Sequence, residues 1–214
     1  YLIGFKNERI RGKKYIDGGV VNNVPLNSLV KRGYEDIIEV RIYGPGREPR
    51  VRMPKESEKY EIAPRVKLGS IIEFSEKRSR QNLMIGYYDA KRMLYGLEGS
   101  IYYLEQTHEE EYYGRLLGDM REIEKAEIAF VLKLPLGYTD KELFLGMLEA
   151  TAKLLQIPKY QVYTVDQLYD MVYKKYETRN DRINLPRFVH ILTGLRGGLT
   201  MNLKGRNFLT LKDY

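Results

Sequence analysis

Residues Lys13 to Leu26 read K-K-Y-I-D-G-G-V-V-N-N-V-P-L, and this segment predicts how the first part of the chain is built. Lys13 to Ile16 is predicted to form a short strand. Asp17-Gly18-Gly19 is predicted to form a tight turn, because Asp and Gly are favoured turn residues. A strand that ends in Asp-Gly-Gly holds a carboxylate at its tip beside bare backbone, which suits a catalytic acid or base. Asp17 is therefore the first candidate catalytic residue.

The residues that follow continue the pattern of an α/β fold. Pro25 stands where a helix can begin, because its missing N–H is not needed in the first turn. Leu26, Leu29 and Val30 give that helix an apolar side, and Gly33 is expected to end it. Ile37 to Tyr43 is rich in β-branched residues and predicts a strand. Strand, turn, helix and strand in this order predict a parallel sheet with helical crossovers.

Helical patterns dominate the rest of the chain. Residues 76–97 carry one apolar stripe at spacings of four and three, which predicts a helix packed on a sheet or, alternatively, a basic amphipathic membrane helix. Its members are Leu83, Tyr87, Ala90, Leu94 and Leu97. Capping boxes at Thr139 and Thr164 predict two further helix starts. Each is followed by an apolar stripe at helical spacing. The members of the two stripes are Leu143, Met147, Ala150 and Leu154, and Val165, Leu168, Tyr169, Val172 and Tyr176. Residues 105–214 are therefore expected to be a mainly helical extension.

The composition narrows the classes of function. The 214 residues carry a formal net charge of +7, which favours anionic partners such as a membrane surface. No cysteine is present, so disulfides and thiolate metal sites are excluded. His108 and His190 lack metal-ligand spacing, so each is expected to be a satisfied or solvated side chain, and no metal or cofactor is expected. Neither phosphate-binding motif, Gly-x-x-x-x-Gly-Lys-Ser/Thr or Gly-x-Gly-x-x-Gly, occurs in the sequence. Nucleic-acid binding is not expected, although the chain has 19 tyrosines.

The chain shows no targeting segment. No apolar run approaches the roughly 18–20 residues that a membrane span needs, and no signal peptide pattern is present. A cytoplasmic or peripheral membrane location is expected. Because the chain starts at Tyr1 rather than Met, we expect it to begin inside a longer protein.

A nucleophile to match Asp17 is missing from these residues. A serine at the centre of Gly-x-Ser-x-Gly would be the usual nucleophile of an α/β hydrolase. None of the six serines stands in that motif; they are Ser28, Ser57, Ser70, Ser75, Ser79 and Ser100. If Asp17 belongs to a catalytic pair, the other member lies elsewhere.

Residues 12–26, followed by Gly33 and residues 37–40, closely resemble the Asp-Gly-Gly block of patatin-like phospholipases. Residues 69–70 and 86–90 also resemble this family, notably its bacterial members. The similarity covers about the first 100 residues and is most specific over the first 40.

The resemblance implies a three-layer α/β/α fold and a Ser-Asp dyad without histidine. The family's serine and its glycine-rich oxyanion loop both precede the residues present here. By position, Asp17 corresponds to the dyad acid, and Gly18 and Gly19 correspond to the turn that holds it. The implied activity is hydrolysis of lipid esters by a serine acyl hydrolase, with no cofactor. The chain by itself is expected to be inactive.

The expected organisation is a C-terminal part of the acyl hydrolase domain over residues 1–104 and the helical extension over residues 105–214. The substrate would be a lipid or another ester, with peripheral contact to anionic membrane. Two alternatives stay open: a non-catalytic module that docks on membrane or protein, and a degenerate relative that has lost the serine. Asn22 and Asn23 are expected to be turn-stabilising amides rather than substrate ligands.

Overall fold

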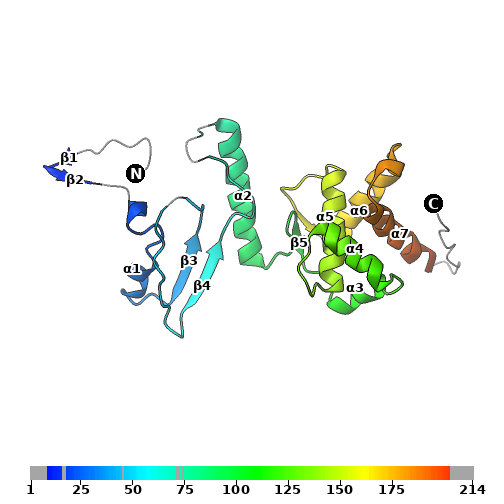
Figure 1. Cartoon of the computed structure of the whole chain (residues 1–214), viewed down its shortest axis with the longest axis horizontal. Helices are drawn as coiled ribbons and strands as arrows, with labels where there is room; N and C mark the ends of the chain where they lie inside the picture. Colours follow the sequence, from blue (N-terminus) through cyan, green and yellow to red (C-terminus); the bar gives the residue numbers. More distant parts are fainter. Residues whose placement is uncertain (1–8, 16–17, 45, 71–72, 74, 203–214) are drawn as a thin grey trace. The chain divides into compact units, whose positions relative to one another are not determined.

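The computed structural model describes residues 9–15, 18–44, 46–70, 73 and 75–202 of the chain (Figure 1). The chain folds into two compact units, Tyr1–Met93 and Leu94–Tyr214. It is of mixed α/β class, as the sequence predicts. Strands are concentrated in the first unit and helices in the second. The two units are described separately below.

Unit 1 begins with small elements and ends in a long helix. Its elements are β1 (Arg9–Ile10), β2 (Lys13–Lys14), the 3-10 helix η1 (Gly18–Val20), α1 (Leu26–Val30), β3 (Asp36–Val40), β4 (Glu58–Ile62) and most of α2 (Glu76–Tyr95). The predicted strand at Lys13 is confirmed over two residues, and α1 begins directly after Pro25. Gly33, predicted to end the helix region, has a φ of +80°, which favours glycine.

β3 and β4 are parallel, with Asp36 opposite Glu58 and Val40 opposite Ile62. The predicted parallel sheet joining the strand at Lys13 to β3 is wrong within the described residues, because β2 pairs with β1 in antiparallel orientation in a separate sheet. The connection between β3 and β4 contains no helix in the residues described. Pro49 and Pro54 lie in the connection, and each lacks the backbone N–H that a helix interior needs. This sheet is therefore a parallel pair of strands joined by an irregular connection.

α2 forms where it was predicted, but most of its apolar stripe is not buried. Leu83 is 71% exposed and Tyr87 is 53% exposed. The buried residues of the helix are Ile85, Asp89 and Arg92, and Arg92 Nη1 lies 3.1 Å from Asp89 Oδ1. The predicted packing of this stripe on a sheet is therefore wrong within the residues described. Periodicity identifies an apolar face of a helix, but not the surface that covers it.

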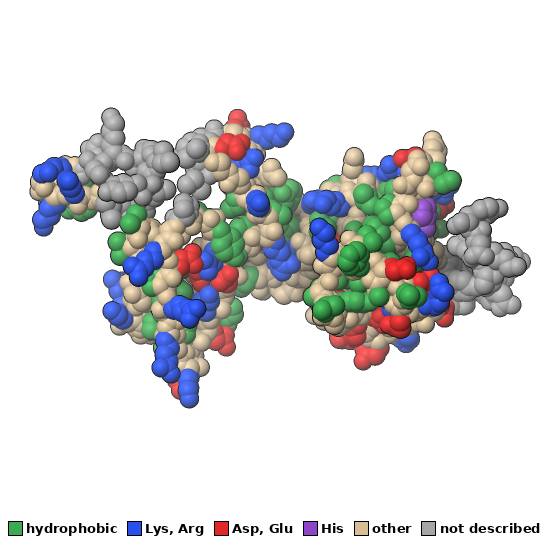
Figure 2. All heavy atoms as spheres, viewed as in Figure 1, with side chains coloured by type: hydrophobic (Ala, Val, Ile, Leu, Met, Phe, Trp, Pro, Cys, Tyr) green, Lys and Arg blue, Asp and Glu red, His purple; other side chains and the backbone are tan. Residues whose placement is uncertain are grey.

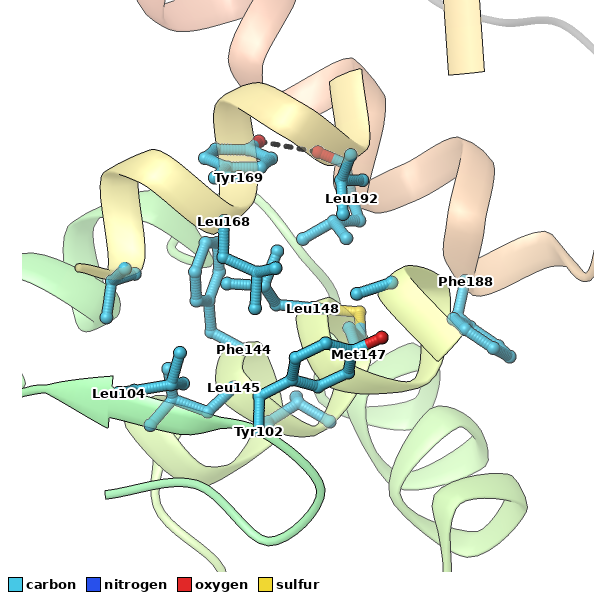
Figure 3. Close-up of a cluster of buried hydrophobic side chains, with 14 of the residues drawn as sticks. Tyr102, Leu104, Phe144, Leu145, Met147, Leu148, Leu168, Tyr169, Phe188 and Leu192 are labelled. Atoms are coloured by element: carbon cyan, nitrogen blue, oxygen red, sulfur yellow. Dashed lines mark hydrogen bonds between the residues drawn. The ribbon is translucent and has the colours of Figure 1, made fainter. Parts of the chain in front are cut away.

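Unit 2 is a helical bundle around α5. Its elements are β5 (Tyr103–Glu105), α3 (Glu110–Leu116), α4 (Glu122–Leu132), α5 (Asp140–Leu154), β6 (Val162–Thr164), α6 (Val165–Glu177), the 3-10 helix η2 (Arg182–Asn184) and α7 (Arg187–Asn202). α3, α4, α6 and α7 all contact α5, and β5 pairs with β6 in parallel. Figure 3 shows the side chains of α5 at the centre of the core, with Phe144, Met147 and Leu148 fully buried.

A buried carboxylate fastens the start of β5 to α5. Glu149 is only 2% exposed. Its two oxygens accept hydrogen bonds from the backbone amides of Ser100, Ile101 and Tyr102 at 2.9, 2.9 and 2.7 Å, and from Ser100 Oγ at 2.7 Å. Gly99 lies so close that a Cβ there would come within 2.6 Å of Glu149 Oε1. The loop before β5 is therefore held by one side chain.

Both predicted capping boxes are present. At α5, Thr139 Oγ1 accepts from the amide of Glu142 at 3.2 Å, and Glu142 Oε2 accepts from the amide of Thr139 at 2.9 Å. Thr164 and Gln167 make the same reciprocal pair at the start of α6, at 3.1 and 3.0 Å. Each box satisfies two amides that have no partner within the helix.

Thr139→Ala is expected to lower the free energy of unfolding by about 1 kcal/mol, because it leaves a helix amide without its cap. Urea unfolding followed by circular dichroism measures this change. Thr139→Ser keeps the hydroxyl and is expected to retain most of the stability. Equal losses in the two variants would show that the hydroxyl is not what stabilises this position.

Candidate functional site

Gly18 and Gly19 form the 3-10 turn that follows β2, whereas Asp17 lies outside the described residues. The turn is closed by two backbone bonds to one acceptor: the amides of Val21 and Asn22 donate to Gly18 O at 3.0 and 2.9 Å. The backbone directly after Asp17 is thus hydrogen-bonded into a compact turn, as the Asp-Gly-Gly pattern predicts.

Asn22 stabilises this turn through its side chain. Asn22 Oδ1 accepts from the amide of Val24 at 3.2 Å, which is an Asx-turn geometry. Its Nδ2 donates to Asn27 Oδ1 at 3.1 Å and so links the turn to α1. These contacts match the predicted role of Asn22 as a turn-stabilising amide.

The turn is tied to the loop that leaves β3. Arg47 N donates to Gly19 O at 2.9 Å, and Asn23 N donates to Arg47 O at 2.7 Å. Asn23 Nδ2 adds a bond to Gly44 O at 3.2 Å, so this amide is also structural. The Gly18-Gly19 turn is therefore fixed at the carboxyl end of a parallel strand. Open α/β sheets place their ligand sites at this edge.

Gly46 belongs to this site, although sequence reasoning did not select it. A Cβ at Gly46 would lie 2.8 Å from Gly19 O and 2.8 Å from Asn23 Cγ. The two segments therefore meet too closely for any side chain at this position. The only sequence signal is that Gly46 follows shortly after the predicted strand.

Gly46→Ala is expected to separate the two segments, because the added methyl group overlaps the carbonyl of Gly19. Hydrogen exchange at the amides of Asn23 and Arg47 should accelerate by tenfold or more, which corresponds to about 1.4 kcal/mol of local stability. Gly44→Ala is the matched control, since a Cβ at Gly44 meets nothing within 4 Å. Unchanged exchange in Gly46→Ala would mean that this contact does not hold the turn.

A charged network covers the face of β3 and β4 that carries Glu39. Glu39 is 5% exposed, 2.7 Å from Lys59 Nζ and 3.5 Å from Arg41 Nε. The hydrogen bond to Glu39, and then the bond to Glu61, raise the pKa of Lys59 above its usual value. The hydrogen bond to Glu48 likewise raises the pKa of Arg41. Because these charges neutralise one another, the network is suited to stabilising the strand pair.

Both histidines have partners, as predicted. His108 Nε2 lies 3.1 Å from Asp166 Oδ2, and its ring stacks on Tyr112 with centroids 3.8 Å apart. His190 Nδ1 lies 2.9 Å from the Tyr176 hydroxyl. Among the residues that the structure describes, no cluster of three side chains is suited to binding a metal ion.

One hollow of about 340 Å³ lies at the opposite end of the strand pair from the Gly18-Gly19 turn. It is bordered by the residues that precede β3 and β4: Val30, Gly33, Tyr34, Glu35, Pro54, Lys55 and Glu56. It contains neither glycine of the candidate site.

Comparison with known proteins found no matching family model, no matching curated protein and no matching solved structure. Within the described part of the chain, no helix has the length and apolar character needed to cross a bilayer.

Proposed function

We propose that this chain is the C-terminal part of a patatin-like serine acyl hydrolase that acts on lipid esters. Residues 1–104 would complete a three-layer α/β/α catalytic domain, and residues 105–214 would form a helical extension. Asp17 would be the acid of the Ser-Asp dyad, with the serine contributed by residues upstream. The observation that carries this proposal is the pair of backbone hydrogen bonds that joins the Gly18-Gly19 turn and Asn23 to Arg47, in the loop that follows β3.

The proposed chemistry is acyl transfer followed by hydrolysis. The Asp17 carboxylate takes the proton of the serine hydroxyl as the oxygen attacks the ester carbonyl. The same proton passes to the departing alcohol, which leaves an acyl-serine. Asp17 then takes a proton from water as the water oxygen attacks the acyl group. It returns this proton to the serine oxygen as the carboxylic acid leaves, which restores both members of the dyad. A direct Ser-Asp pair needs no imidazole, which agrees with two histidines that already have partners in unit 2.

The uncovered apolar face of the strand pair also supports a larger domain. Ile38 is 59% exposed and Val40 is 69% exposed, although both belong to a β-branched strand. They share a face with their partners in β4, Tyr60 and Ile62. A three-layer fold covers both faces of its sheet, so further elements of such a domain would bury this face.

A labelling experiment tests the proposal. The coding DNA upstream of the Tyr1 codon is read, and the longer product is expressed beside the 214-residue chain. A fluorophosphonate probe is expected to label a serine in the longer product and none in the chain alone. Labelling of the chain alone, or an upstream reading frame without Gly-x-Ser-x-Gly, would overturn the proposed dyad.

A further inference from the structure

The β1–β2 hairpin has an unusual composition and is closed by a two-residue turn. Arg11 and Gly12 occupy the turn with φ of +49° and +77°, the positive values that a type I′ turn requires. Arg9 lies opposite Lys14, and Ile10 lies opposite Lys13. All six residues are exposed. The hairpin therefore presents every one of its side chains to the surroundings.

The six residues of the hairpin concentrate positive charge. Four of its six residues are cationic and none is acidic. Arg9 and Lys14 are directly opposite, and like charges in this arrangement destabilise a strand pair. Among the described residues, no ion pair involves any of the four cations, whereas Arg41 and Lys59 of the same unit are both paired with carboxylates. An anionic partner would relieve this repulsion.

Exposed apolar side chains accompany the cations. Ile10, within the hairpin, and Tyr15, directly after it, are each 56% exposed. Figure 2 shows the Lys and Arg side chains gathered at the tip of the hairpin. Cations beside aliphatic groups suit the headgroup boundary of an anionic bilayer, where the cations meet phosphate and the apolar groups enter the acyl region. A single tyrosine gives no stacking platform for nucleic acid.

We propose that the β1–β2 hairpin, residues 9–14, is a peripheral membrane-binding element that contacts anionic phospholipid headgroups. The inference goes beyond the proposed hydrolase activity, because such binding needs neither Asp17 nor a serine. Since only Tyr15 and Ile16 separate the hairpin from Asp17 in the sequence, it would bring a lipid surface to that part of the chain. Each cation is expected to strengthen binding by about fivefold.

Vesicle sedimentation with the 214-residue chain tests the inference. The chain is expected to bind vesicles of phosphatidylcholine that contain about 30% phosphatidylglycerol, because the phosphatidylglycerol headgroups make the surface anionic. Binding should fall with added salt and be absent with phosphatidylcholine alone. The hairpin variant R9Q/R11Q/K13Q/K14Q should bind roughly several hundredfold more weakly, the product of four effects of about fivefold. A second variant, R115Q/K153Q/K159Q/K174Q, removes the same charge from exposed sites in unit 2 and should bind nearly as well as the unchanged chain.

Equal loss of binding in the two variants would overturn the inference, since net charge rather than the hairpin would then be responsible. So would binding to a single-stranded oligonucleotide with no binding to anionic vesicles. A site-specific probe gives an independent measurement that does not depend on the fourfold variants. Because the chain has no cysteine, Ile10→Cys can be labelled with an environment-sensitive fluorophore. Its emission should shift to the blue with anionic vesicles, whereas the same label at Lys159→Cys should not; the opposite pattern would contradict the proposal.

Discussion

Asp17→Asn in the full gene product is expected to lower kcat for a short-chain ester by about 10²–10⁴-fold, the usual contribution of a positioned general base. Asn has nearly the shape of Asp but cannot accept the serine proton. Because the substitution removes a group that acts in the transition state, kcat and kcat/KM should fall together. Hydrolysis of p-nitrophenyl butyrate, followed at 400 nm (about the absorption maximum of the product), measures both constants.

Asp36→Asn is the matched control for this prediction. Asp36 is the first residue of β3 and is exposed, so the same change of chemistry there should leave kcat within about twofold. Circular dichroism should show that both variants are folded. Equal activity of Asp17→Asn and the unchanged enzyme would remove Asp17 from the mechanism, and equal losses in both variants would assign the effect to the fold.

Glu149→Ala is expected to lower the free energy of unfolding of unit 2 by about 4 kcal/mol. The change removes an acceptor of four hydrogen bonds and leaves the amides of residues 100–102 without it. A donor left unsatisfied in the interior costs about 1–3 kcal/mol. A typical domain has only about 5–15 kcal/mol of stability, so the variant should be close to unfolding at 37 °C. Urea unfolding followed by circular dichroism tests this expectation.

Two further variants distinguish the loss of the Glu149 hydrogen bonds, here called the Glu149 clamp, from a general effect of removing a glutamate. Glu127→Ala removes an exposed carboxylate from α4 and should cost less than about 0.5 kcal/mol. Gly99→Ala should destabilise strongly, because its Cβ would come within 2.6 Å of Glu149 Oε1 and its φ is +86°. If Glu149→Ala lowered the free energy of unfolding by less than about 1 kcal/mol, the value of a single ordinary hydrogen bond, the Glu149 clamp would not be an important source of stability.

Local features were predictable from sequence because their partners are close along the chain. Each capping box involves residues three positions apart, and both boxes are present at the predicted threonines. The α6 stripe is confirmed for Val165, Leu168, Tyr169 and Val172, which are buried, whereas its last member, Tyr176, is only partly buried against the core. The α5 stripe was too narrow: Leu154 is 43% exposed, while Phe144 and Leu148, outside that stripe, are fully buried. A helix surrounded by several others buries more than one stripe.

Features that depend on distant residues were not predictable in the same way. The Asp-Gly-Gly pattern identified Gly18 and Gly19, but their attachment to Arg47 and Gly46 joins residues far apart in the sequence. The exposure of the α2 stripe shows the same limit, since burial of Leu83 requires a covering surface that periodicity does not specify. From the sequence alone, Glu149 is an ordinary charged residue on a helix, because its partners, from Ser100 to Tyr102, lie 47–49 positions earlier.

The Glu149 clamp also sets an order of events during protein synthesis. Ser100 leaves the ribosome 49 residues ahead of the carboxylate that holds it. At a synthesis rate of about 5–20 residues per second, roughly 2–10 s pass between the synthesis of Ser100 and that of Glu149. During that interval Tyr102 and Leu104, both fully buried in the finished unit, have no core to enter. The nascent chain therefore presents a short apolar segment to chaperones until α5 has emerged.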